Sequence, residues 1–163
     1  MPSALVPLAN LTLGSTASTV TFSSISGSYR DIRLIVSAKD NASQPLKFRF
    51  NGDTGTNYNL VEMDGDGSAT GSASAANISV GFFSYNYSAL NATNFSVCTM
   101  DVMDYSATDK HKIGLIRVSD ASQTSGATAI RWASTSAITS LTLVSQGAFQ
   151  VGSTFALYGT ASA

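Results

Sequence analysis

Residues 30–38 read Arg-Asp-Ile-Arg-Leu-Ile-Val-Ser-Ala, and this stretch indicates the fold class of the chain. Ile32, Leu34 and Val36 recur at every second position, with mostly polar side chains between them. In a β-strand, successive side chains point to opposite faces, so a period of two collects these three residues on one face. The stretch therefore predicts a strand with one side buried in a core.

The same alternation recurs along the chain, in segments separated by Gly, Asn, Asp or Ser clusters. Helical spacing of apolar residues is not sustained anywhere. We expect strands near residues 4–13, 18–24, 30–38, 45–51, 57–63, 76–83, 94–104, 111–119, 127–133, 137–145 and 153–160. Further inward-facing residues are expected at Val20, Phe22, Leu46, Phe48, Phe50, Phe95, Val97, Cys98, Met100, Val102, Ile113, Leu115, Phe155 and Leu157.

The segments that join these strands are short and rich in turn residues. Residues 51–55 (Asn-Gly-Asp-Thr-Gly) and 122–126 (Ser-Gln-Thr-Ser-Gly) are examples. Parallel strands need crossovers of a dozen or more residues, for which the spacing leaves little room. The sequence therefore predicts an all-β fold, an antiparallel two-sheet β-sandwich that is jelly-roll-like, as a single domain over residues 1–163.

Composition narrows the possible functions. The 163 residues include 26 Ser and 17 Thr but only 10 acidic and 9 basic side chains, and the net charge is −1. This balance argues against a nucleic-acid partner. Cys98 is the only cysteine, so we expect no internal disulfide. The amino end lacks the pattern of a signal peptide, and no apolar run reaches the length of a membrane helix, so we expect synthesis in a cytoplasm and no membrane partner.

Candidate catalytic groups are sparse. His111 is the only histidine, whereas a hydroxyl or thiol nucleophile needs a neighbouring base. Cys98 alternates with apolar residues, as a small buried side chain does. Asp101 and Asp104 are three apart on a predicted strand and so fall on opposite faces, which argues against the carboxylate pair of a glycosidase. We expect a non-enzymatic protein without a catalytic or cofactor site.

Residues 64–77 are strongly biased toward small side chains, and we interpret them as a long loop. The segment begins Asp-Gly-Asp-Gly-Ser, as a calcium loop does, but Ala75 occupies the twelfth position, where such a loop has a bidentate Glu. We therefore expect no metal here, with calcium bound through other loops as the alternative.

Two segments are candidates for partner binding. Phe83, Tyr85 and Tyr87 alternate on one face of a strand, where they could form an exposed patch for a protein or a sugar; alternatively, Phe83 and Tyr85 fill the core. At the amino end, residues 1–8 are expected to form an extended arm that adds to a partner's sheet, because Pro resists pairing within its own sheet. The arm's candidate contacts are Pro2, Leu5, Val6 and Pro7.

Four stretches together resemble a group of tailed-bacteriophage virion structural proteins, of the kind found in phages of marine and cyanobacterial hosts. They are Thr-Val-Thr-Phe-Ser-Ser-Ile at 19–25, Arg-Phe-Asn-Gly-Asp-Thr-Gly-Thr-Asn-Tyr at 49–58, Ala-Ile-Thr-Ser-Leu-Thr-Leu at 137–143 and Gly-Ser-Thr-Phe-Ala-Leu-Tyr-Gly at 152–159. The resemblance covers roughly the first 60 and last 30 residues. It implies a non-enzymatic virion component and brings no catalytic residues.

Two functions are compatible with this resemblance. The first is a capsid decoration or cement protein, a homotrimer made in the host bacterial cytoplasm that binds the major capsid protein on the outside of the phage head. The alternative is a tail or fibre adhesin that binds a host surface glycan through residues 64–77 and the aromatic run. A sandwich that works in a symmetric, high-copy assembly tolerates low charge, because the lattice supplies further contacts.

Overall fold

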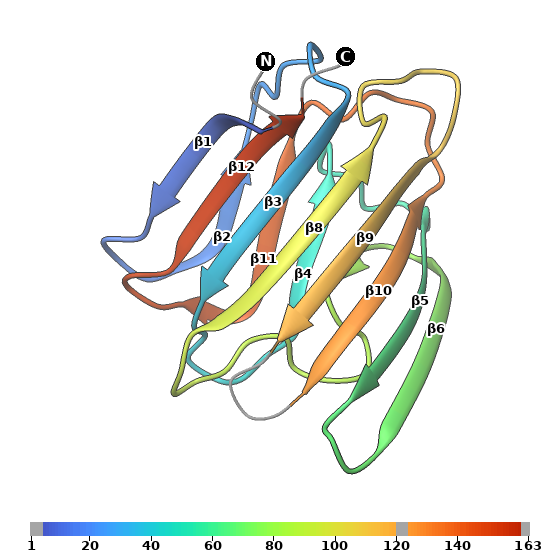
Figure 1. Ribbon diagram of the computed structural model, residues 1–163. Coiled ribbons are helices and arrows are strands. Elements are labelled where there is room, and N and C mark those ends of the chain that lie inside the picture. The colour runs from blue at the N-terminus through green and yellow to red at the C-terminus, as the bar shows by residue number, and fades with distance from the viewer. Residues whose placement is uncertain (1–4, 120–123, 161–163) are drawn as a thin grey trace.

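The computed structural model describes residues 5–119 and 124–160, which fold into two antiparallel β-sheets that face each other (Figure 1). The strands are β1 (Val6–Thr12), β2 (Ala17–Phe22), β3 (Asp31–Ala38), β4 (Leu46–Phe50), β5 (Tyr58–Gly65), β6 (Thr70–Ile78), β7 (Gly81–Phe82), β8 (Ser96–Met103), β9 (Lys112–Ser119), β10 (Ser125–Trp132), β11 (Leu141–Phe149) and β12 (Thr154–Thr160). No helix in the described chain is long and apolar enough to cross a bilayer. The expected all-β, antiparallel sandwich is confirmed.

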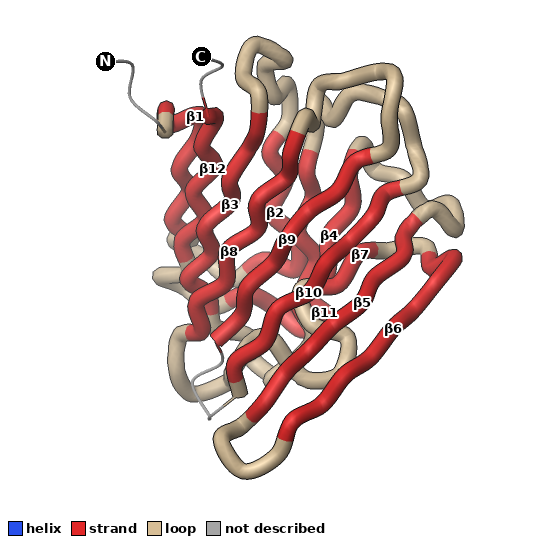
Figure 2. The backbone as a smooth tube through the Cα atoms, turned by 45° about the vertical axis from the view of Figure 1, so that its right-hand side comes forward, coloured by secondary structure: helices blue, strands red, loops and turns tan. Residues whose placement is uncertain are grey.

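The order of the strands in the two sheets defines the topology of the sandwich. The larger sheet has the order β1-β12-β3-β8-β9-β10-β5-β6, and the smaller has β2-β11-β4-β7. The first four strands of the larger sheet and the four of the smaller are arranged as a jelly roll, in which consecutive strands of the chain cross between the sheets at β1/β2, β2/β3, β3/β4, β7/β8 and β11/β12. The remaining strands, β9, β10, β5 and β6, extend the larger sheet to one side (Figure 2).

The core lies between the sheets and is rich in aromatic rings. Phe48 sits at its centre, with ring centroids 5.0 Å from Phe50 and 5.7 Å from Phe83. Trp132, on β10, packs 5.6 Å from Phe50 and so joins the added strands to the jelly roll. The alternation in residues 30–38 is confirmed, because Ile32, Leu34 and Val36 on β3 are all buried and belong to this core.

The predicted loop at 64–77 is wrong, because most of it forms the hairpin of β5 and β6. The hairpin turns at Asp66, whose Oδ1 accepts hydrogen bonds from the backbone N–H groups of Ser68 and Ala69 at 2.9 and 2.8 Å. Gly67 supplies the positive φ of 88° that the turn requires. β6 is the edge strand of the larger sheet, at the end formed by the added strands. Its side chains do not have to fill the core between the sheets, so small residues are tolerated there.

Two other boundaries also differ from the expectation. The strand expected at 76–83 is divided between the end of β6 and the two-residue β7. The strand expected at 137–145 begins only at Leu141 and continues to Phe149, because residues 137–140 are bound to Asn51 instead. The Asn51 side chain donates to the Ala137 carbonyl at 2.8 Å and accepts from the Thr139 N–H at 2.8 Å.

Candidate interaction face

The larger sheet has one side turned away from the smaller sheet, which we call the outer face. Because side chains alternate along each strand, every second residue of β3, β8, β9, β10 and β5 lies on this face. The register aligns these residues in rows across the sheet. One row runs from Arg33 through Asp101, Leu115 and Ala129 to Val61.

The outer face is unusually apolar for an exposed surface. Met63 and Val61 are 68% and 63% exposed. Of the ten exposed large hydrophobic side chains in the described chain, six lie here: Val61, Met63, Val97, Met103, Ile113 and Leu115. Four of these six are carried by the added strands β5 and β9, so the extension of the jelly roll creates most of the patch. A cluster of this kind makes the outer face a candidate interaction surface.

A pair of arginines shares one carboxylate at the centre of the outer face. Arg33 Nε lies 2.5 Å from Asp101 Oδ1, and Arg117 binds the other carboxylate oxygen at 3.0 Å. The hydrogen bond to Asp101 raises the pKa of the Arg33 guanidinium. The two cations leave the group with one net positive charge amid aliphatic side chains. Arginine within an apolar surface is characteristic of protein–protein contacts.

A broad, open groove of about 1120 Å³ runs over this face. Its walls include Arg33, Ile35, Met63, Val97 and Arg117, and the rest of its lining is mainly Gly, Ala, Ser and Thr. None of the described residues that line it is aromatic. Sugar-binding surfaces depend on aromatic rings for stacking, so the lining fits a protein surface better than a glycan.

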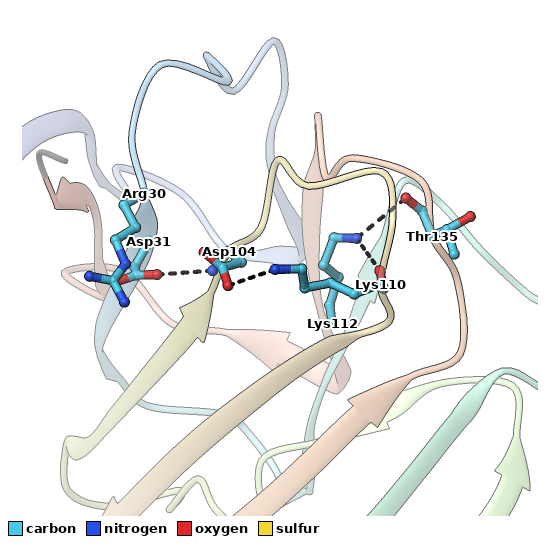
Figure 3. A network of polar contacts seen from close by, with 6 residues as sticks. All are labelled: Arg30, Asp31, Asp104, Lys110, Lys112 and Thr135. Carbon is cyan, nitrogen blue, oxygen red and sulfur yellow. Dashed lines mark hydrogen bonds and ion pairs between the residues drawn. The ribbon is translucent and has the colours of Figure 1, made fainter.

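The loops at one end of the sandwich are joined by a polar network (Figure 3). Asp31 accepts a hydrogen bond from the Asp104 N–H at 2.9 Å, and Lys110 lies 3.3 Å from the Asp104 carboxylate. The buried Lys112 ammonium donates to the carbonyls of Lys110 and Thr135 at 2.9 and 3.4 Å. Burial lowers the pKa of Lys112. These contacts fasten the loops to one another.

The candidate catalytic residues are dispersed. Cys98 is fully buried, and burial raises the pKa of its thiol to about 12, so it is not a nucleophile near neutral pH. His111 contacts Arg131, with Nδ1 2.8 Å from the guanidinium. Asp101 and Asp104 belong to the separate contacts described above. Among the described residues, no group of three or more His, Cys, Asp or Glu side chains is placed to hold a metal ion.

The aromatic run does not form the exposed face that its alternation suggested. Phe83 is completely buried against Phe48, whereas Tyr85 is 45% exposed. Tyr87 is half-buried beneath β10, where a Cβ on Gly126 would lie 2.5 Å from its hydroxyl oxygen. The segment turns under the added strands and covers their inner side. Of these three aromatic side chains, Tyr85 alone remains exposed.

The expected arm at residues 1–8 is also corrected in part. Val6 and Pro7 belong to β1 and pair with Gly159 and Tyr158 of β12 in the chain's own sheet. Pro7 is accommodated because β1 is an edge strand with a register shift next to it, so its missing N–H breaks no ladder. Leu5 directly precedes β1 and is half-buried, and Pro2 lies outside the described residues.

Glu62 is a structurally important residue that the sequence analysis missed. It is the only glutamate in the chain, and it is 1% exposed on the inner side of β5. Its carboxylate accepts hydrogen bonds from the Ser84 hydroxyl and the Tyr85 N–H, both at 2.6 Å, and from the Asn86 N–H at 3.2 Å. A lone Glu at an inward-facing strand position was the available signal. Glu62 holds the covering loop against the sheet.

The Arg49–Tyr58 stretch that carries the resemblance has a structural role. Asp53 Oδ2 accepts from Trp132 Nε1 at 2.6 Å and from Asn57 Nδ2 at 2.9 Å, and its Oδ1 accepts from the Gly55 N–H at 2.7 Å. The stretch thus fixes the turn between β4 and β5 to β10. None of its residues lines the groove on the outer face.

No family model and no curated protein matches the chain.

Proposed function

We propose that this protein is a non-enzymatic structural component of a tailed-phage virion, a decoration protein that binds the major capsid protein on the outside of the head. The observation that carries the proposal is the outer face, a wide aliphatic surface with a central arginine pair and no aromatic lining. Its composition suits a protein partner. The resemblance of four sequence stretches to phage virion proteins indicates that the major capsid protein is the partner to test.

Two further features support this function. The jelly roll is a common architecture of virion proteins. The carboxylates Glu62, Asp53 and Asp101 are engaged in hydrogen bonds or ion pairs that hold the fold or the face together. They are therefore not arranged as the acid and base of a hydrolase.

The alternative is a tail or fibre adhesin that binds a host glycan. It is favoured by one observation, the open groove on a jelly-roll sheet, because lectins use the same architecture. The absence of aromatic side chains among the described residues of this groove favours the decoration function instead.

The test uses capsids of the encoding phage that lack the protein. We expect the purified chain to bind them, and the double variant Met63→Lys/Leu115→Lys to lose at least about tenfold in affinity, because each lysine would bury an unpaired charge in an apolar contact. Val151→Lys is the matched control, since Val151 is 56% exposed but lies away from the outer face. All three proteins should have the same far-ultraviolet circular dichroism spectrum.

Tight binding to host cells or to isolated host glycans, with no binding to decoration-free capsids, would contradict the decoration function and establish the adhesin. Equal loss of capsid binding by the Val151→Lys control would contradict the assignment of the outer face.

A further inference from the structure

The larger sheet ends in an open edge at β6. Among the described strands, β5 alone is hydrogen-bonded to β6, so one side of its nine residues carries no ladder (Figures 1 and 2). The Asn77 N–H is bonded on the side of β5, to Asn59 Oδ1 at 2.9 Å. The N–H and C=O groups of β6 that point away from β5 have no partner within the described chain. A row of this kind is a template for another extended strand.

β6 differs from the other three edges of the sandwich. β1 contains Pro7 and a register shift, β2 has six residues and a register shift beside it, and β7 has only two residues. β6 is the longest of the four and reads Thr-Gly-Ser-Ala-Ser-Ala-Ala-Asn-Ile, without a proline or a charged side chain. Proteins normally protect a long edge with such devices. From Thr70 to Ala75 the edge of β6 carries none of them, and its register shift against β5 falls only beyond that stretch, between Ala75 and Ile78.

The side chains of β6 indicate what kind of strand would fit. Strand-addition sites for foreign peptides use side-chain pockets to select their ligand. Ser72 and Ser74 are exposed on the outer face, while Ala73 and Ala75 alternate with them on the inner side. The groove of the outer face reaches only Thr70 and Gly71 at the start of β6, so the rest of the strand offers no such pocket. A second copy of β6 has neither bulk nor charge to oppose its approach. An antiparallel pair about a two-fold axis also satisfies both open edges at once.

We propose that β6 pairs antiparallel with β6 of a second copy of this chain, which joins two larger sheets edge to edge. The outer faces of the two copies then lie on the same side, and their apolar patches become parts of one wider surface. This two-fold contact is the arrangement that the edge geometry favours over the homotrimer expected from the sequence. It forms in solution and does not depend on the proposed function.

The test is the mass of the purified full chain by sedimentation or light scattering at micromolar concentration. We expect twice the chain mass of 16.9 kDa. The variant Ser72→Lys/Ser74→Lys should be monomeric, because like charges would meet across the edge. The control Ser18→Lys/Thr19→Lys adds the same charge to the β2 edge of the smaller sheet and should stay dimeric. Both should keep the wild-type circular dichroism spectrum.

A charge-reversal experiment identifies the partner. Ser72→Glu/Ser74→Glu should also be monomeric, and an equimolar mixture with the lysine variant should restore a dimer, because the same strand of each copy would then carry opposite charge. A wild-type monomer, a trimer, a dimer that survives both β6 variants, or a mixture that stays monomeric would each overturn the proposal. Met63→Lys/Leu115→Lys should remain dimeric, so failure of capsid binding and failure of β6 pairing are separate results.

Discussion

At the scale of single residues, two carboxylates hold separate parts of the chain together. Glu62 holds the loop that covers the added strands, and Asp53 ties the turn after β4 to Trp132. Buried polar groups are costly unless hydrogen-bonded, and each of these carboxylates accepts three hydrogen bonds. These two carboxylates therefore stabilise the fold by accepting hydrogen bonds from donors that would otherwise lack a partner.

Glu62→Ala should destabilise the protein by about 3 kcal/mol, because it leaves two backbone N–H groups without an acceptor in a buried setting. Glu62→Gln keeps the size and one acceptor oxygen and should cost less. Urea unfolding measures both, with Asp109→Asn as the control at an exposed position. Equal stability of the alanine variant and the wild type would contradict the fastening role.

Asp53 should make the free energy of unfolding depend on pH in the acid range. Burial acts to raise the pKa of Asp53, but the hydrogen bonds from Trp132, Asn57 and Gly55 outweigh it, and the pKa lies below its ordinary value. A carboxyl whose pKa is lower in the folded state stabilises the fold above its unfolded pKa of about 3.9, and this contribution is lost as the pH falls through the folded pKa.

The measurement is urea unfolding of the wild type and Asp53→Asn between neutral pH and about pH 2. The difference in unfolding free energy should be constant near neutrality and shrink below about pH 4. Asp66, whose backbone hydrogen bonds from Ala69 and Ser68 lower its pKa to about 2, titrates in both proteins and cancels in the comparison. A difference that does not change with pH would contradict the assignment.

At the scale of elements, the two-residue strand β7 is closely packed against the core. β7 pairs with β4 through Lys47 and Phe48 only, yet it delivers Phe83 into the core. Gly81 makes this possible, because the Phe48 ring lies directly against its backbone, where a Cβ would overlap the ring. The glycine is required here by close approach rather than by an unusual φ.

Gly81→Ala should therefore destabilise the fold by about 1–3 kcal/mol through overpacking. Gly14→Ala is the control, since nothing lies within 4 Å of a Cβ at that position. Combining Gly81→Ala with Phe48→Leu should cost less than the sum of the two single changes, because the smaller side chain removes the overlap. Additive losses in thermal or urea unfolding would show that the two residues do not conflict.

At the scale of the whole molecule, the two ends of the described chain lie together. β1 pairs with β12, and Val6 is directly opposite Gly159. β12 also pairs with β3, so it is the link between the first strand and the rest of the larger sheet. The larger sheet is therefore complete only when β12 has paired with both β1 and β3.

A circular permutant should test this closure. Joining the native ends through a short Gly/Ser linker and opening the chain between Gly67 and Ser68 should leave a folded sandwich, because the new ends fall in an exposed turn. Deleting β12 should instead leave no cooperative unfolding transition, since both β1 and β3 lose a partner. Circular dichroism and thermal melting distinguish the two, and a cooperative fold without β12 would contradict the prediction.

The class of fold and most of the strands could be predicted from the order of the residues, because alternation is a local property of residues two positions apart. Ile32, Leu34 and Val36 show this directly. Which side of each strand is covered, and by what, depends on the packing of the two sheets. Val97, Ile113 and Leu115 were predicted to face inward, yet all three lie on the outer face, because the sheet packs through the opposite side of β8 and β9. Alternation with a period of two does not show which face of a strand is buried when both faces carry apolar residues.

The same limit applies to the candidate sites. Phe83 and Tyr85 are two residues apart and equally aromatic, but one fills the core and the other is exposed, since the chain turns under the added strands after Phe83. Residues 71–77 lack the large side chains that are typical of a strand, and they form one because they pair with β5. That pairing, the outer face and the open edge all depend on neighbours distant in the chain, and such contacts are fixed by the packing of the whole molecule.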